Sequence, residues 1–290
     1  MQSPTLMDLF GGSGGYTEGP LLVLDDVSVS FGGVAALREI SLTVGQGELL
    51  AVIGPNGAGK TTLLNCICGL ARMSHGRMSF NGVDTNGRST AHLAKLGLGR
   101  SFQDPPLVDE ATVLENVLIG AHLDLAYRMA DQLCRRRRVV SLEADARRRA
   151  RLLLDAIGLG GLGDHLAGGL PYGSRKLVDI ARALISHPRL LLLDEPTSGL
   201  DGREQQLVRD LLEELRRTPG STVLIVEHHM DVVRAVATGV IGLQAGSMLA
   251  KGTPQEVLDS ELFRAAIVGG VPDLPAAESV PADNPNGGQP

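Results

Sequence analysis

The octapeptide Gly54-Pro55-Asn56-Gly57-Ala58-Gly59-Lys60-Thr61 limits the possible folds of this chain more than any other stretch of its sequence. It has the pattern G-x-x-x-x-G-K-[ST], in which glycines let backbone N–H groups curl around anionic oxygens. Residues 48–53, which are apolar after Glu48, predict a strand that enters the loop, and residues 60 to about 71 predict a helix that leaves it. Thr62 is assigned to the same segment. Because the positive end of the helix dipole adds to the attraction, we expect this unit to bind the phosphates of a nucleotide.

Two acidic residues later in the chain supply the groups that nucleotide hydrolysis needs. In the loop, Lys60 is expected to reach the β- and γ-phosphates, and the Thr61 hydroxyl is expected to ligate Mg²⁺. The apolar run 190–193 predicts a strand buried on both faces, which ends in Asp194 and Glu195. Asp194 is placed to hold the Mg²⁺ shell, and Glu195 is placed to polarise the attacking water. The sequence therefore predicts hydrolysis of ATP with Mg²⁺ as cofactor.

Strand and helix patterns alternate along most of the chain. Residues 27–31 alternate apolar and polar side chains as in a half-buried strand, and Asn81-Gly82 is a hairpin-turn signal. From about 104 to 169 the character is helical, and the spacing of apolar residues over 146–154 marks an amphipathic helix. The run 222–226 predicts another buried strand. This alternation predicts an α/β fold with a parallel-sheet core that a helical insert interrupts.

Composition separates a folded region from the two ends of the sequence. Hydrophobic residues make up 43% of the 290 residues, and the net charge of −6 argues against a nucleic-acid partner. Residues 1–20 are interpreted as a flexible leader, and residues 272–290, rich in Pro, Asn and Gly, as a disordered tail. No apolar run approaches the ~20 residues that span a bilayer, and the N-terminus lacks a signal-peptide pattern. We expect a soluble, cytoplasmic chain that reaches a membrane only through a partner.

The cysteines and two arginine runs are interpreted as structural features rather than as functional sites. Cys66, Cys68 and Cys134 form no even disulfide set and no complete zinc site, so we interpret them as buried thiols. The arginine runs 135–138 and 147–149 are interpreted as a solvated helix face, with contact to lipid headgroups or a partner as the alternative.

Four further short segments stand before and after the phosphate loop, in the order in which a known family carries its motifs. They contain Phe31, Gln103 within Gly-Arg-Ser-Phe-Gln, Asp201 within Ser-Gly-Leu-Asp, and His228 after the strand at 222–226. With these segments and the phosphate loop, the chain resembles the nucleotide-binding subunit of an ABC transporter. The resemblance covers about residues 21–270 and implies a P-loop NTPase core with a mixed sheet, an antiparallel β subdomain and a helical subdomain insert.

The resemblance also implies a role for each of these residues. Phe31 stands where the family places the aromatic residue that stacks on adenine, and Gln103 matches the glutamine that touches Mg²⁺ and water and signals to the membrane subunit. Asp201 belongs to the loop that crosses the dimer interface. His228 matches the switch histidine at the γ-phosphate, and His229 is disfavoured because family members more often carry an acid there.

The family signature, Leu-Ser-Gly-Gly-Gln, is altered here to Leu170-Pro171-Tyr172-Gly173-Ser174. In the family this segment binds the γ-phosphate held by the opposite subunit. Pro171 offers neither a hydroxyl nor a backbone N–H, whereas Tyr172 and Gly173 still offer N–H donors to that nucleotide. We therefore expect a heterodimer with a second ABC ATPase subunit, in which the site completed by Pro171 is the weaker one. A homodimer, with two weak sites, is the alternative.

The domain and its partners follow from the same resemblance. The ATPase domain is predicted at 21–271, with the helical subdomain at about 104–172. The Tyr172 signature and the segment 112–117 are similar to those of branched-chain amino acid, amide and urea importers. This implies transmembrane permease subunits, an extracytoplasmic solute-binding protein acting indirectly, and a peripheral location on the cytoplasmic face of the membrane. The alternatives are a lipid or lipopolysaccharide export complex, a non-transport ABC ATPase and, disfavoured by the intact motifs, a regulatory pseudo-ATPase.

Overall fold

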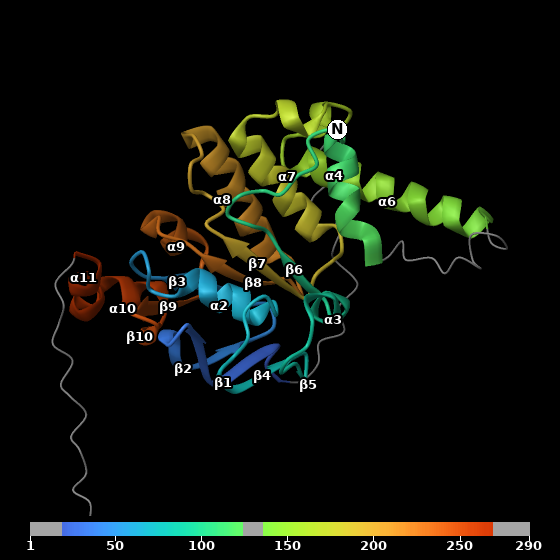
Figure 1. The fold of residues 1–290 in the computed structure, drawn as a ribbon. Coiled ribbons are helices and arrows are strands. Elements are labelled where there is room, and N and C mark those ends of the chain that lie inside the picture. Colours follow the sequence, from blue (N-terminus) through green and yellow to red (C-terminus); the bar gives the residue numbers. More distant parts are fainter. Residues whose placement is uncertain (1–18, 124–135, 269–290) are drawn as a thin grey trace, which may run out of the picture.

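The computed structural model describes residues 19–123 and 136–268, which fold into two sheets with helices around them (Figure 1). The predicted tail, and the leader up to residue 18, lie outside the described residues. The strands are β1 (Leu22–Phe31), β2 (Val34–Val44), β3 (Leu49–Ile53), β4 (His75–Phe80), β5 (Val83–Asp84), β6 (Leu98–Arg100), β7 (Leu190–Asp194), β8 (Thr222–Val226), β9 (Gly239–Gln244) and β10 (Ser247–Gly252). The α-helices are α2 (Lys60–Ile67), α3 (Thr90–Lys95), α4 (Val113–Ile119), α6 (Arg136–Ala156), α7 (Tyr172–Leu184), α8 (Gly202–Arg217), α9 (Met230–Val236), α10 (Pro254–Asp259) and α11 (Glu261–Val268). The described residues also contain the 3-10 turns η1 (Gly120–Leu123), η2 (Gly160–Leu162) and η3 (Ala167–Gly169).

A six-stranded sheet with the order β10-β9-β3-β8-β7-β6 forms the centre of the fold. β3 pairs in parallel with β8 on one side and with β9 on the other, and β7 and β6 continue the parallel arrangement. β10 is antiparallel to β9, so the sheet is mixed. Because the parallel strands share one direction, the carboxyl ends of β3, β7 and β8 lie at one edge, where ligands bind in such sheets. The predicted parallel-sheet core is confirmed.

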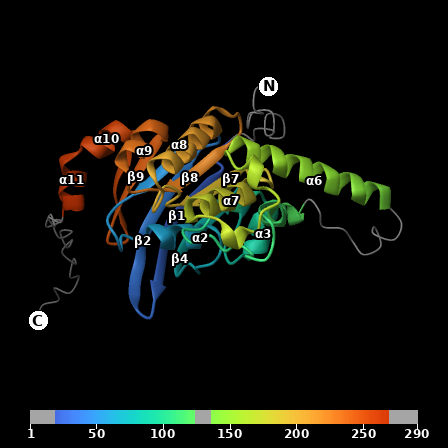
Figure 2. The same cartoon turned by 90° about the horizontal axis from the view of Figure 1, so that it is seen from above.

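Alternate residues of the central strands point to opposite faces and join two separate hydrophobic clusters. In β3, Leu49, Ala51 and Ile53 pack with apolar residues of α4 and the helices α6 to α11, whereas Leu50 and Val52 pack with α2 and the antiparallel sheet. Figures 1 and 2 show these layers on the two sides of the central sheet. Burial on both faces explains the uninterrupted apolar runs of β7 and β8.

The second sheet is antiparallel, with the order β2-β1-β4-β5. Asn81 and Gly82 connect β4 to β5 with φ of 52° and 73°, the positive values that a tight hairpin turn requires. In β1 the predicted alternation holds at Val27 and Val29, which are buried, but not at Phe31, which is 55% exposed. A register shift between Val29 and Ser30 separates Phe31 from the buried face. Phe31 is therefore a surface aromatic residue rather than part of the core.

The predicted helical region begins later than expected. Residues 104–112 contain no helix, since Pro105 lacks a backbone N–H and Pro106 disfavours helical geometry before it; α4 starts at Val113. In α6 the apolar face predicted over 146–154 is buried. α6 projects beyond the other helices in both views (Figures 1 and 2).

The structure tests only part of the predictions about the arginine runs and the domain boundaries. Arg147 and Arg148 are exposed, as expected for a solvated face, whereas the side chains of the run 135–138 lie outside what the structure describes. The domain boundaries 21–271 and the subdomain boundaries 104–172 stay predictions.

Candidate functional site

The phosphate loop is held in a conformation that only glycine fits at two positions. At Gly54, whose φ is 152°, a Cβ atom would collide with the main-chain oxygen of Leu243 in β9. At Gly59, whose φ is 99°, a Cβ atom would lie 2.7 Å from the main-chain oxygen of Ala36 in β2. The loop therefore lies tightly between the two sheets. α2 follows at once but ends at Ile67, four residues earlier than predicted, before the positive φ of Gly69.

A pocket of about 1100 Å³ opens over this loop at the carboxyl edge of the central sheet. It brings the loop and Thr62 together with Gln103, Glu195 and His228, which come from three distant parts of the sequence. The remaining lining residues are Val34, Ala35, Ala36, Arg38, Ser198, Met230, Ala245 and Gly246.

Lys60 is buried beneath the loop, and its ammonium group faces main-chain oxygens. Its Nζ donates to Gly54 O at 2.8 Å and to Pro55 O at 3.0 Å. Burial lowers the pKa of Lys60, while the nearby carboxylates of Glu195 and Asp194 oppose that shift. The loop is thus preformed around a cation, which phosphate oxygens can reach from the pocket.

Three of the predicted catalytic side chains meet at one carboxylate oxygen. Gln103 Nε2 donates to Glu195 Oε2 at 3.3 Å, and His228 Nδ1 lies 3.9 Å from the same oxygen. Glu195 has φ of +48°, a left-handed conformation that is rare for a residue with a Cβ atom and that tends to occur at functional sites. The arrangement can hold a water molecule between Glu195 and a phosphate bound by the loop.

Asp194 lies beneath the pocket with an unsatisfied acceptor. It is 2% exposed, its Oδ2 lies 3.4 Å from Arg100 Nη2, and its Oδ1 is buried without a hydrogen-bond partner. Burial raises the pKa of this carboxyl group, and Arg100 opposes the shift. Mg²⁺ keeps several waters and is held by one or two oxygen ligands in nucleotide sites. The orphaned oxygen and the exposed hydroxyl-bearing Thr61 fit such an ion.

Arg100 is a site residue that sequence reasoning did not single out. Besides Asp194, its guanidinium reaches Asn65 Oδ1 and Cys68 Sγ, both at 2.8 Å. It therefore fixes Asp194 relative to α2. Cys66 and Cys68 are buried free thiols, and Cys134 lies outside the described residues.

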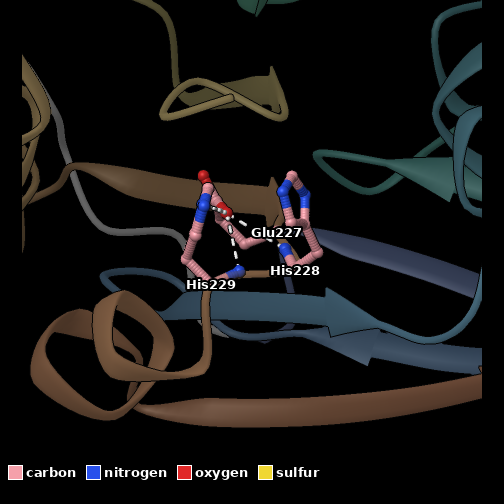
Figure 3. Close-up of side chains that lie close together, drawn as sticks. All are labelled: Glu227, His228 and His229. Carbon is pink, nitrogen blue, oxygen red and sulfur yellow. Dashed lines mark hydrogen bonds and ion pairs between the residues drawn. The ribbon is translucent and has the colours of Figure 1, made fainter. Parts of the chain in front are cut away.

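Glu227, His228 and His229 lie close enough together to be considered as a metal site, and Figure 3 shows them. Glu227 is fully buried. Its Oε1 accepts from the N–H and hydroxyl of Thr197, and its Oε2 accepts from the N–H groups of His228 and His229. A carboxylate has about four lone-pair sites, so none is left for a cation. The cluster is therefore a hydrogen-bonded support for the loop after β8.

The two histidines differ in where their rings point (Figure 3). His229 Nδ1 lies 2.8 Å from Thr197 Oγ1, within the support, whereas His228 lines the pocket. The geometry therefore favours His228 over His229 as the group at the γ-phosphate.

The other sequence-predicted residues do not line this pocket. Tyr172 donates its hydroxyl to Gln103 O at 3.0 Å, and a Cβ atom at Gly173 would collide with the Glu204 carboxylate. Asp201 caps α8 by accepting from Glu204 N at 2.8 Å. Phe31 is an exposed residue at the end of β1. Tyr172, Gly173 and Asp201 thus lie outside the pocket of their own chain.

The site has the features of a P-loop nucleoside triphosphatase. These are a glycine-rich loop before a helix, two carboxylates at the end of β7, and a histidine after β8. The family model described as ABC transporter matches residues 37–198. The high-affinity branched-chain amino acid transport ATP-binding protein LivG of Salmonella typhimurium is 34% identical over 82% of this chain and 93% of the relative. The chain belongs to the ABC transporter family and is an ATP-binding, ATP-hydrolysing subunit.

Solved structures agree with this assignment. The ADP conformation of MJ1267, an ATP-binding cassette of an ABC transporter, has a TM-score of 0.73 at 29% identity and covers 87% of this chain and 99% of that chain. The dimeric post-hydrolysis state of the cassette MJ0796, bound to ADP and phosphate, has a TM-score of 0.67 at 28% identity, with 80% and 98% covered. The predicted fold class, with its mixed sheet and antiparallel β subdomain, is confirmed.

Proposed function

We propose that this chain powers the import of branched-chain amino acids or related small polar solutes. The observation that carries the proposal is the likeness to LivG, which extends over 93% of that relative and is combined with a complete set of hydrolytic side chains in one pocket. Solute choice would rest with the membrane and binding subunits, so the contribution of this chain is the energy of ATP hydrolysis.

In the proposed reaction the phosphate loop and Lys60 hold the β- and γ-phosphates of ATP, and exposed Phe31 stacks on the adenine. Thr61 and Asp194 would hold Mg²⁺, which neutralises charge on the phosphate oxygens when bound. Glu195 Oε2 orients and polarises the attacking water.

Two neighbours support Glu195 in this step. Gln103 fixes the direction of the carboxylate through its 3.3 Å hydrogen bond, and it also belongs to the shell of the ion in this proposal. His228 lines the same pocket, 3.9 Å from Glu195 Oε2, and in this proposal it donates to the γ-phosphate as negative charge develops there. Each group acts from a loop that follows a different strand of the sheet.

The nucleotide is proposed to be enclosed by a second ABC ATPase subunit. The pocket is open at the edge of the sheet, and Tyr172, Gly173 and Asp201 lie outside it. Tyr172 and Asp201 are exposed and could face a nucleotide on another chain, whereas Gly173 is buried behind the Glu204 carboxylate. The dimeric MJ0796 cassette supports this arrangement. The missing hydroxyl and N–H at Pro171 favour an unequal pair, with an intact signature supplied by the partner.

Permease subunits are proposed to contact the chain beside Gln103. A groove of about 200 Å³ lies there, lined in part by Phe102, Ile119 and His122, and Ile119 is 46% exposed. A helix of a permease would transmit the movement of Gln103 to the membrane. Such a contact would hold the chain in a peripheral position on the cytoplasmic face of the membrane. Within the described ranges no helix has the length and apolar character to cross a bilayer.

The test is reconstitution of the complex that co-purifies with this chain in liposomes. We expect ATP hydrolysis to rise several-fold when a solute-binding protein loaded with leucine, isoleucine or valine is added, and labelled solute to accumulate inside. Lys60→Ala in this chain is the matched control and should abolish both signals. Stimulation by lipid or lipopolysaccharide, without solute accumulation, would contradict import and favour an export complex.

A further inference from the structure

Lys176 is a buried cation that the proposed reaction does not use. It lies in the second turn of α7 and is 2% exposed. Its Nζ donates to Glu195 O at 2.6 Å and to Ser198 O at 2.8 Å. Both acceptors are main-chain oxygens of the loop after β7. The ammonium group therefore connects the helix that begins at the altered signature with the loop that carries the proposed catalytic carboxylate.

The loop needs such a connection because of its backbone conformation. Glu195 adopts φ of +48°, which persists in residues with a Cβ atom where the surroundings hold it. The N–H of Glu195 donates to Val226 O at 2.9 Å, and its C=O accepts from Lys176. Since both main-chain groups of Glu195 are bound by other elements, the direction of its side chain is fixed as well.

The surroundings of Lys176 extend the connection to Gln103. The Lys176 ammonium lies 5.5 Å from the ring centre of Tyr172, whose hydroxyl donates to Gln103 O. Burial lowers the pKa of Lys176, whereas the carboxylates of Glu227, Glu195, Asp194 and Asp104 oppose that shift. The first two turns of α7 thus touch the loops of both Gln103 and Glu195.

We propose that Lys176 is a positioning residue that makes the orientation of Glu195 depend on the position of α7. In the proposed dimer the start of α7 faces the nucleotide of the partner subunit, so occupancy of that site reaches Glu195 through Lys176. This inference rests on the proposed roles of Glu195 and of the signature segment.

The experiment compares four variants of the full chain within its co-purified complex. Lys176→Met should lower kcat about tenfold or more, the effect of losing hydrogen bonds to a charged group, with KM for ATP changed less than about twofold because Lys176 does not line the pocket. Lys176→Arg should restore much of kcat, since a guanidinium can donate to both oxygens. Arg175→Met is the matched control: Arg175 binds Asp109 and Ala167 O, not the Glu195 loop. Glu195→Gln tests the underlying role.

A second readout separates positioning from folding. Hydrogen exchange of residues 195–200 should be faster in Lys176→Met than in wild type or Arg175→Met. If Lys176→Met does not fold, Lys176→Gln, which keeps one donor group, carries the test by the same criteria. Retention of kcat within about twofold, or unchanged exchange, overturns the inference when Glu195→Gln is inactive. Near-normal turnover of Glu195→Gln would instead overturn the role of Glu195.

Discussion

Glu195 Oε2 has Gln103 on one side and His228 on the other, so the effect of each side chain can be measured separately. Glu195→Gln keeps the size of the side chain but cannot accept a proton from water. We expect kcat to fall by about 100-fold or more while ATP still binds, because the phosphate loop is unchanged. Single-turnover hydrolysis and equilibrium binding of ATP would measure the two quantities. Turnover close to wild type would remove Glu195 from its proposed role.

Burial of Cys66 predicts a pH-dependent stability. Burial raises the pKa of this thiol from 9.0 to about 11. The unfolded chain therefore loses the proton first, so the contribution is fully present below pH 9 and is lost as pH rises from 9 to 11. The free energy of unfolding should fall over this range by about 2–3 kcal/mol more in wild type than in Cys66→Ala. Urea unfolding at pH 8 and pH 11 gives the comparison, and equal losses in both proteins would refute it.

The residues that could be predicted from sequence are those with a local pattern. Lys60 stands in an octapeptide of fixed spacing, and Asp194 ends an apolar strand. Arg100 and Lys176 could not be found in this way, because each acts on a segment far along the chain: Arg100 on Asp194, and Lys176 on the loop after β7. Glu227 was visible only as a neighbour of His228, and its buried network with Thr197 depends on the tertiary fold.

Among the helices and strands, too, some boundaries could be predicted from the sequence and others could not. The strand predicted at 48–53 is β3, Leu49–Ile53, because burial on both faces leaves a clear apolar run. The helix predicted to about 71 stops at Ile67, and the region from 104 stays irregular until α4. Glycine sets the end of α2 and proline delays the start of α4. The spacing of apolar residues does not indicate either boundary.

The contact between α4 and α7 provides a test of packing at the scale of elements. A Cβ atom on Gly120, just after α4, would collide with the main-chain oxygen of Arg182 in α7. Because Gly120 has an ordinary helical φ of −64°, Gly120→Ala isolates packing from backbone strain. We expect a loss of about 1–3 kcal/mol in the free energy of unfolding.

Gly161→Ala is the matched control for this change. No atom lies within 4 Å of a Cβ built at Gly161 in η2, so its stability should stay close to wild type. Thermal and urea unfolding of the two variants give the comparison. Equal stability of both would contradict the tight contact between α4 and α7.

The start of α7 tests the proposed unequal pair. Pro171 is the N-cap of α7 and makes no side-chain cap. Pro171→Ser supplies a hydroxyl and an N–H, and hydrogen bonds to a charged phosphate are worth about 1.5–3 kcal/mol. ATP hydrolysis by the reconstituted complex should therefore rise by about tenfold to a hundredfold. A marginal rise would contradict the view that Pro171 weakens one of two sites.

At the scale of the whole molecule, the proposed dimer predicts that ATP drives association. Glu195→Gln should form a stable dimer with the co-purifying ATPase subunit when ATP is added, and the dimer should dissociate with ADP. Light scattering after size-exclusion chromatography reports the mass, and Lys60→Ala, which should not bind ATP, should stay monomeric. A dimer of this chain alone, as tight as the mixed one, would favour the homodimer.

The position of β3 in the central sheet also affects how the chain matures on the ribosome. β3 is an early strand, yet both of its neighbours, β8 and β9, come from the last third of the described chain. A nascent chain that has not reached residue 222 leaves both edges of β3 unpaired, and the adjoining phosphate loop lacks the central sheet on one of its two sides. Competence to bind ATP should therefore appear late and abruptly during synthesis, so that an unfinished subunit does not compete for nucleotide.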